Sequence, residues 1–360
     1  MSNAPHRPAF RCLLGSTLLA LAACAGQPAP RTVSPIPASP PVQAAASPAP
    51  IVHLFCQPGS RSVDFAAVGV PQGEPPIAVA LSPSYVWVLF QPARLLRVDR
   101  AGGSTVQMLV GDTGERWDAL DVDPLDGSVW IGEEHPFSLH HVSPDLHRTT
   151  VKVRRVQGDG AFSRLLAARD ALYVSAAGAD QQVWRLGRDG GVLDRAFPSA
   201  HPEAAAEPRR LEVGASRLVH DGEGGVVFWD GAMRRAFARK ETGWAPSAVH
   251  WFDGERDRAT AVKGVGVGTK SELWYVDGWD FRSLIFWKGR PVFLGTYAMG
   301  SKGMANLLVV PAADGGPAHE LFDQCGDARL ADAASDATGY VGLTGRGVVI
   351  GDFATSPDLP

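Results

Sequence analysis

The chain has 360 residues, of which 45% are hydrophobic, so it can bury a large core in one domain or two. Its formal charge of −4 indicates a mildly acidic surface, which excludes the basic footprint expected of a nucleic-acid-binding protein. Forty glycines and 28 prolines indicate many turns, and no long stretch repeats its apolar residues with helical spacing. We therefore expect an all-β fold.

The first 23 residues have the pattern of a signal peptide. Arg7 and Arg11 precede an apolar segment, Cys12–Ala23, which is too short to cross a bilayer. We therefore expect residues 1–23 to direct export and to be removed from the mature protein.

The end of this segment, Leu21-Ala22-Ala23-Cys24, resembles the lipobox of bacterial lipoproteins. The resemblance implies cleavage before Cys24, a diacylglycerol on its sulfur and an acyl chain such as palmitate on its new amino group. Ala25 rather than aspartate follows Cys24, which in Gram-negative lipoproteins implies export to the outer membrane. Cys24 would then anchor the protein there, facing the periplasm or the cell surface. An ordinary secretory signal cleaved nearby is the alternative.

Residues 24–50 have the composition of a tether. They are rich in Pro, Ala, Ser and Gln and carry almost no charge, so they cannot bury enough apolar surface to offset the entropy of ordering. Their prolines favour an extended chain of about 3.1 Å per residue, which reaches roughly 80 Å. We therefore expect the folded domain to comprise residues 51–360.

The stretch Asp118–Glu133 is the basic unit of this domain. It predicts a strand over Ala119–Val122, a Pro-Leu-Asp-Gly turn and a second strand over Ser128–Gly132, because Asp-Gly between alternating runs is a strong hairpin signal. Similar units recur from Ile77 onward. The chain is therefore a repeat protein.

An aromatic residue marks the second strand of each expected unit. The series is Trp87, Trp130, Tyr173, Phe228, Trp274 and Tyr340. Most intervals are 43 to 55 residues, close to the roughly 40 to 50 residues of a four-stranded propeller blade. The last interval is 66 residues long and contains an extra apolar run, Leu307–Val310, which is either an insertion or a seventh blade. Leu284–Trp287 is expected as the third strand of the fifth unit.

The ends of the chain suggest how the ring closes. The last unit ends near Phe353 after only three strands, and Ser62–Val70 could supply the fourth. Such pairing would remove the open strand edges. We predict a β-propeller of six four-stranded blades, or seven as the alternative, closed by an N-terminal strand that pairs with the last blade.

This pattern, over residues 62–353, resembles the six-bladed propellers of the NHL-repeat, virginiamycin B lyase-like and senescence-marker/gluconolactonase groups. The element DGSVWIGE, within Asp118–Glu133, also resembles the repeats of two-component-regulator propellers. In the lactonase-like group, Glu, Asn and Asp from different blades hold a divalent metal. Those positions cannot be matched residue by residue in this chain, so the resemblance supports the fold and leaves the activity open.

Two motifs that suggest ligand chemistry are better explained by the repeat. Gly264–Ser271 nearly matches a phosphate-binding loop, but Thr269 replaces a required glycine and a strand rather than a helix follows. Asp121, Asp123 and Asp126 resemble the start of a calcium loop but lack its later ligands. We interpret both as hairpin sequences.

The densest histidines also predict no metal site. They are His135, His140, His141 and His147. Strand alternation would place His140 and His141 on opposite faces of a sheet, whereas a metal needs three or four converging ligands. We expect no cofactor, and a divalent metal at the channel mouth only if the protein is an enzyme.

Cys56 and Cys325 are the two cysteines of the folded domain. Cys56 immediately precedes the expected closing strand, and Cys325 precedes the first strand of the last blade. Both would therefore lie at the same seam, and we predict a disulfide between them. A disulfide is consistent with an exported protein.

The favoured function is a lipid-anchored, periplasm-facing propeller that binds or scaffolds a protein or small-molecule partner. The lack of hydrolase, zinc-protease and thiol-redox signatures argues against an enzyme. The alternative is a lactonase- or lyase-type enzyme with a metal or an acid and histidine at the channel mouth. In that case His135, flanked by Glu134, is the candidate general base.

Any partner is expected at the mouth formed by the loops that enter each first strand and leave each second strand. Residues distant in sequence converge there, and their arginines and tryptophans offer forked hydrogen bonds and flat apolar area. The binding candidates are Arg116, Trp117, Asp118, Arg164, Arg209, Asp277, Trp279, Asp280 and Arg329. Trp117 and Trp279 are expected in loops. The alternative is that these charges pair with one another as a solvated rim.

Overall fold

The computed structural model describes residues 51–57, 59–102, 106–133, 137–153, 161–177, 182–195, 217–221, 224–230, 235–241, 243–250, 259–261, 274–276, 279–298, 304–311, 319–323 and 329–359. The expected signal peptide, lipobox cysteine and tether, together with Cys325, lie outside these residues. Pro48–Pro360 forms one compact unit. No helix in the described part of the chain has the length and apolar character needed to cross a membrane.

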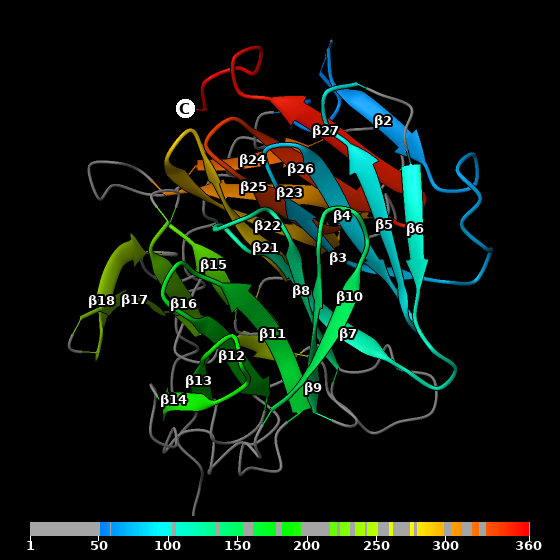
Figure 1. Ribbon diagram of the computed structural model, residues 1–360. Helices are drawn as coiled ribbons and strands as arrows, with labels where there is room; N and C mark the ends of the chain where they lie inside the picture. The colour runs from blue at the N-terminus through cyan, green and yellow to red at the C-terminus, as the bar shows by residue number, and fades with distance from the viewer. Residues whose placement is uncertain are drawn as a thin grey trace, which may run out of the picture. The chain divides into compact units, whose positions relative to one another are not determined.

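The described strands form a six-bladed β-propeller, and each blade has four antiparallel strands (Figure 1). Blade 1 consists of β3 (Pro76–Leu81), β4 (Tyr85–Phe90), β5 (Arg94–Asp99) and β6 (Val106–Val110). Blade 2 consists of β7 (Trp117–Val122), β8 (Val129–Glu133), β9 (Ser138–Val142) and β10 (Arg148–Lys152). Blade 3 consists of β11 (Ala161–Ala167), β12 (Leu172–Ala177), β13 (Gln182–Leu186) and β14 (Val192–Arg195).

Blades 4 and 5 are also built from four consecutive strands, whereas blade 6 takes one strand from the N-terminal part of the propeller unit. Blade 4 consists of β15 (Arg217–His220), β16 (Val226–Asp230), β17 (Arg235–Lys240) and β18 (Gly243–His250). Blade 5 consists of β21 (Trp279–Trp287), β22 (Arg290–Ala298), β23 (Met304–Val310) and β24 (His319–Asp323). Blade 6 consists of β25 (Leu330–Ser335), β26 (Gly339–Thr344), β27 (Gly347–Asp352) and β2 (Arg61–Asp64). The sheet of blade 5 also contains β1 (Ile51–Val52), β19 (Ala259–Ala261) and β20 (Trp274–Val276).

The first strands of the six blades surround a central channel. Neighbours in this ring follow the blade order, and β25 of blade 6 contacts β3 of blade 1 to close it. The predicted closure is confirmed: β2 pairs antiparallel with β27, with Arg61 opposite Ile350 and Asp64 opposite Gly347 (Figure 1). Gly347 permits this pairing, because a Cβ at this position would lie 2.3 Å from the Val63 carbonyl oxygen.

The blade 2 hairpin forms as the sequence predicts. Val122 lies opposite Val129, and the Asp123 amide donates a 2.7 Å hydrogen bond to the Ser128 carbonyl across the turn. Asp126 accepts from the Ser128 amide, and Gly127 has a φ of 75°, a left-handed conformation that glycine adopts readily. Asp126 and Gly127 therefore have a structural role in the turn, as the hairpin interpretation predicts.

The predicted aromatic series is buried between blades at five of its six positions. Trp87, Trp130, Tyr173, Phe228 and Tyr340 are all buried in their second strands. Such rings fill the wedge between neighbouring sheets, where a large flat side chain buries the most area.

The prediction for the fifth unit is wrong. Trp274 lies in β20, and the second strand of blade 5 is β22, where Phe293 is buried. Leu284–Trp287 belongs to the first strand of this blade, and Leu307–Val310 belongs to its third, so this run is neither an insertion nor a seventh blade, and the described strands form six. The error arose because Trp274-Tyr275-Val276 has the same aromatic and β-branched composition as a second strand.

Candidate functional site

The channel contains a cavity of about 1020 Å³, a volume that suits a small organic ligand or a peptide end. Its wall is built from the first strands of all six blades and from the turns that follow them. We call the end formed by these turns, which include Ser82–Ser84, Asp123–Gly127 and Asp336–Ala337, the hairpin mouth. The opposite end, where loops enter the first strands, is the loop mouth.

Much of the cavity wall is apolar, and a few polar groups converge within it. Leu120, Leu165, Leu218 and Leu284 line it from blades 2 to 5. Apolar walls with a small number of placed polar groups are typical of sites that bury a ligand and fix its orientation.

The first polar feature of the cavity is a pair of residues from blades that are not neighbours. The Nε2 atom of His220 in blade 4 lies 3.4 Å from Oδ2 of Asp121 in blade 2. The same oxygen accepts a 2.7 Å hydrogen bond from the Ala167 amide in blade 3. Asp121 therefore connects three blades at the channel wall.

His220 is charged over a wider pH range than an isolated histidine. Burial alone would lower its pKa, but the hydrogen bond to Asp121 and the negative charges of Asp121 and Asp221 outweigh burial and raise the pKa above its usual value. The channel thus holds an imidazole whose protonated form is stabilised near neutral pH.

The second polar feature is a set of arginines. Arg164 in β11 is half-buried and Arg169 in the following turn is exposed, and both line the cavity. Within the described ranges neither forms an ion pair with a carboxylate. A guanidinium at a ligand cavity can fork onto a carboxylate or a phosphate.

Two further arginines hold the rim of the hairpin mouth. Arg188, between β13 and β14, binds both oxygens of Asp123 at 2.7 and 2.9 Å. Arg100, between β5 and β6, binds both oxygens of Asp336 in the same way. Burial would raise the pKa of Asp123, but hydrogen bonds from Arg188, Trp130 and Leu125 lower it below its usual value. Asp123 is therefore a structural anion.

The structure places few of the predicted site residues at this cavity. Arg164 lines it. Arg116, whose side chain is 68% exposed, pairs with Asp118 at 3.2 Å near the loop mouth, and Arg329 is exposed just before β25. Trp279 and Asp280 are the first residues of β21. Glu134, His135, Arg209 and Asp277 lie outside the described residues.

Trp117 is not a loop aromatic. It is the first residue of β7, and its side chain is fully buried among apolar residues of blades 1 and 2. The strand begins two residues earlier than the hairpin pattern predicts, because a β-bulge between Trp117 and Ala119 accommodates Asp118. Trp117 therefore contributes to packing.

Sequence reasoning missed His220 and assigned Asp121 to a hairpin only. The available signal was that both residues lie in expected first strands. First strands line the channel of a propeller, so their titratable residues are candidates for the cavity wall. A separate group also escaped prediction: Glu115, Glu133 and His140 bring possible metal-ligand atoms within 4.8 Å of one another.

Comparisons with known proteins support the fold. No family model matches the chain, and no curated protein matches it by sequence. Among solved structures, virginiamycin B lyase from Staphylococcus aureus is 9% identical with a TM-score of 0.51, covering 81% of this chain and 98% of that one. A structure of YCF48 bound to D1 peptide is 13% identical with a TM-score of 0.51, covering 86% and 100%. At such identities the likeness shows a shared propeller fold, as the repeat pattern predicts.

Proposed function

We propose that the propeller is a binding module whose channel takes a ligand with an anionic group and an apolar body, admitted through the hairpin mouth. The observation that carries this proposal is Arg164, a half-buried guanidinium on the cavity wall that has no carboxylate partner among the described residues. Half-buried arginines elsewhere in the propeller, such as Arg100 and Arg94, are paired.

The charges around Arg164 support the same ligand class. Arg169 adds a second cation from the rim, and His220, whose pKa is raised by its partner Asp121, lies in the first strand of the neighbouring blade 4. Asp123 and Asp336 are neutralised by Arg188 and Arg100. A carboxylate in the cavity would therefore meet the two guanidinium groups of blade 3, while Leu120, Leu165 and Leu284 would contact its apolar part.

The test is a thermal-shift and calorimetric screen of the purified protein with small mono- and dicarboxylates, phosphate esters and short peptides with free carboxyl ends. Arg164→Ala is expected to weaken binding of a positive compound roughly tenfold or more, as for loss of a charged hydrogen bond. The matched control is Arg116→Ala at the loop mouth, which should bind normally. If Arg116→Ala alone loses binding, the site lies at the loop mouth instead. If no anionic compound in the screen binds, the proposal is wrong.

The second candidate function is a lyase or lactonase. The His220–Asp121 pair favours it, because a histidine oriented by a carboxylate can give a proton to a leaving group or take one from a substrate. His220→Asn keeps a polar side chain but cannot titrate, so it should reduce turnover at least 100-fold. His147→Asn, at an exposed histidine of blade 2, is the control. An unchanged rate in His220→Asn would exclude the pair from catalysis.

We also propose that Cys24 anchors the protein in the outer membrane, facing the periplasm or the cell surface. The lipobox-like sequence before it and the two or three acyl chains expected on it support stable attachment, since a single chain of myristoyl size holds only marginally. Cys24→Ser should release the protein from the detergent phase or stall its processing. Unchanged partition into the detergent phase would contradict the anchor.

A further inference from the structure

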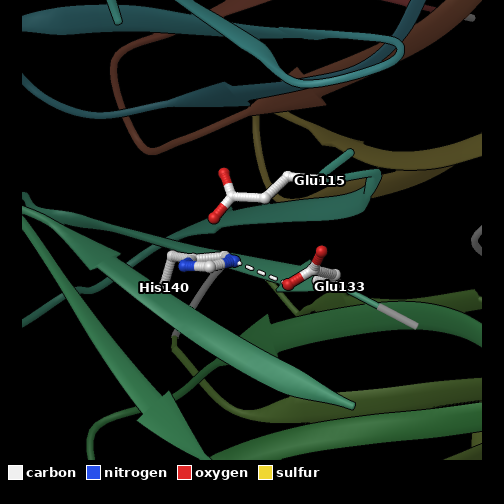
Figure 2. Close-up of side chains that lie close together, drawn as sticks. All are labelled: Glu115, Glu133 and His140. Carbon is white, nitrogen blue, oxygen red and sulfur yellow. Dashed lines mark hydrogen bonds and ion pairs between the residues drawn. The ribbon is translucent and has the colours of Figure 1, made fainter. Parts of the chain in front are cut away.

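A group of metal-binding side chains lies at the loop-mouth end of blade 2, away from the cavity of the channel. Glu115 comes from the loop between β6 and β7, Glu133 ends β8, and His140 is in the middle of β9. Figure 2 shows the two carboxylates and the imidazole turned toward a common point. Their possible ligand atoms all lie within 4.8 Å of one another.

Two of the three groups are buried and already close enough to share an ion. Glu133 is 3% exposed and His140 is 1% exposed, and Oε2 of Glu133 lies 3.2 Å from Nε2 of His140. Two ligand atoms of a tetrahedral zinc ion, each bound at about 2.0–2.1 Å, are about 3.3 Å apart. The buried pair therefore needs almost no movement to bind zinc.

The third group is positioned to move toward the pair. The Glu115 side chain is 18% exposed, and its Oε2 atom binds Arg148 Nη1 at 2.5 Å and the Asp112 amide at 2.9 Å. In the described part of the chain no hydrogen bond is made by its Oε1 atom, which is therefore available to a metal. Its partial exposure also gives an ion a path from solvent.

The outer contacts of the group match those that metal ligands require. A ligating histidine usually fixes its other ring nitrogen by a hydrogen bond, and His140 Nδ1 lies 3.0 Å from Oγ1 of Thr150. Oγ of Ser138 donates a 2.7 Å hydrogen bond to Glu133. When Nδ1–H donates to Thr150, the Nε2 lone pair faces the carboxylates and is available for a cation.

The charge of the group also favours a divalent cation. Glu115 and Glu133 are the two acids of the group, and Arg148 pairs with Glu115 and with the exposed Asp112. Among the described residues no arginine or lysine side chain pairs with the buried Glu133 carboxylate, and an uncompensated charge is costly in a low-dielectric site. A divalent ion would neutralise it.

We propose that Glu115, Glu133 and His140 bind one divalent transition-metal ion, with zinc the best match to one nitrogen and two oxygen donors. Calcium and magnesium prefer all-oxygen sites, so the imidazole selects against them. Three protein ligands leave a fourth position for water. The ion would fasten the loop that precedes β7 to β8 and β9.

The test is zinc titration of the untagged full chain, after chelator treatment, by calorimetry and metal analysis. We expect one zinc ion per chain. His140→Gln and Glu133→Gln should abolish binding, and His147→Gln, at the exposed histidine of the same blade, should bind as the wild type does. If the buried variants do not fold, Glu115→Gln, at the partly exposed ligand, should still weaken zinc affinity at least tenfold.

Cobalt(II) provides an independent readout. Bound cobalt in a site with one nitrogen and two oxygen donors should show visible absorption bands that disappear in Glu115→Gln and persist in His147→Gln. The proposal is overturned if the wild type binds no zinc, or if Glu115→Gln binds zinc as tightly as the wild type, which would indicate an adventitious ion elsewhere.

Discussion

At the scale of single residues, Asp323 is a buried carboxylate whose charged form the fold disfavours. It is buried at the end of β24, where its Oδ1 atom accepts a 2.6 Å hydrogen bond from the Leu54 amide. Burial raises its pKa to about 6, although amide hydrogen bonds from Leu54 and Phe55 act in the opposite direction. The N-terminal segment is therefore attached to blade 5 through a group that titrates near neutral pH.

The raised pKa of Asp323 predicts that mild acid strengthens the fold. The carboxyl is protonated more readily in the folded state than in the unfolded chain, so its contribution to stability is fully present below pH about 4 and is lost as the pH rises through about 6. The full effect is about 3 kcal/mol, of which about 1 kcal/mol falls between pH 5 and pH 7.5.

Urea unfolding at pH 5 and pH 7.5 measures this effect. The wild type should gain about 1 kcal/mol of unfolding free energy at pH 5 relative to pH 7.5 from Asp323. Asp323→Asn should lack this gain, because asparagine cannot titrate. Asp99→Asn, at a residue outside this seam, should keep the pH dependence of the wild type. Equal pH dependence in Asp323→Asn and the wild type would show that the carboxyl does not titrate in this range.

At the scale of elements, the same aspartate–arginine contact joins neighbouring blades at two places in the ring. An aspartate at the start of a first turn, Asp123 or Asp336, binds an arginine in the last turn of the next blade, Arg188 or Arg100. Each arginine also donates to a carbonyl in the first turn of its own blade, Ala168 or Ser82. One guanidinium thus ties three turns at the hairpin mouth.

Removal of such a clamp should destabilise the propeller more than removal of an exposed ion pair. Arg188→Gln leaves the buried Asp123 carboxylate without its cation, and we expect a loss of about 2–4 kcal/mol in the free energy of unfolding. Arg185→Gln removes partly exposed pairs with Asp170 and Asp194 and should cost about 1 kcal/mol or less. Urea unfolding of both variants at pH 7 checks the difference, and equal losses would mean that the clamp is no stronger than a surface pair.

The blade pattern could be predicted from the sequence wherever local chemistry decides it. The Asp126-Gly127 turn needs a left-handed residue, and the aromatic of each second strand follows from packing between sheets. Blade 5 could not be predicted in this way, because β20 and β22 carry similar apolar residues and both pair with β21. Pairing with β23 is what identifies β22 as the second strand. The recurring bulge near the start of the first strand in blades 1, 2, 3, 5 and 6 also has no sequence signal of its own.

At the scale of the whole propeller, the sites depend on contacts that no local pattern reports. His220 and Asp121 meet because the first strands of blades 2 and 4, which flank that of blade 3, converge at the channel. His140 meets Glu115 because the loop that joins blade 1 to blade 2 brings Glu115 close to the side chains of β8 and β9. Alternation along a strand correctly separates His140 from His141, but it says nothing about partners that come from another element.

The predicted disulfide belongs to the seam between the chain ends. β1 pairs with β24, so Val52 lies opposite Asp323, and Leu54 and Phe55 donate to that aspartate immediately before Cys56. Cys325 lies outside the described residues, two positions after Asp323. A disulfide here would close a loop of about 270 residues and add roughly 5 kcal/mol at most.

Mass spectrometry of the intact, unreduced protein tests this pairing. Cys56 and Cys325 should resist alkylation until a reductant is added, and a disulfide-linked pair of tryptic peptides that contains both should separate on reduction into two peptides, each with a free thiol. Cys56→Ser should then free the thiol of Cys325. Two alkylatable thiols in the unreduced protein would rule the disulfide out.

The N-terminal segment fastens two blades at once, which predicts how the ring opens. β1 extends blade 5 and β2 completes blade 6, and between them the buried Phe55 ring packs edge-on against Tyr340 at 5.4 Å. Phe55→Ala should cost about 3–5 kcal/mol of unfolding free energy because it leaves a cavity at this seam.

In Phe55→Ala, hydrogen exchange should become faster first in β24 and β27, whereas β11 and β12 in blade 3 should keep their protection. Leu125→Ala, at an exposed turn residue, should change neither stability nor exchange. Uniform loss of protection in every blade of Phe55→Ala would mean that the ring unfolds as one unit and that the seam is no weaker than any other interface.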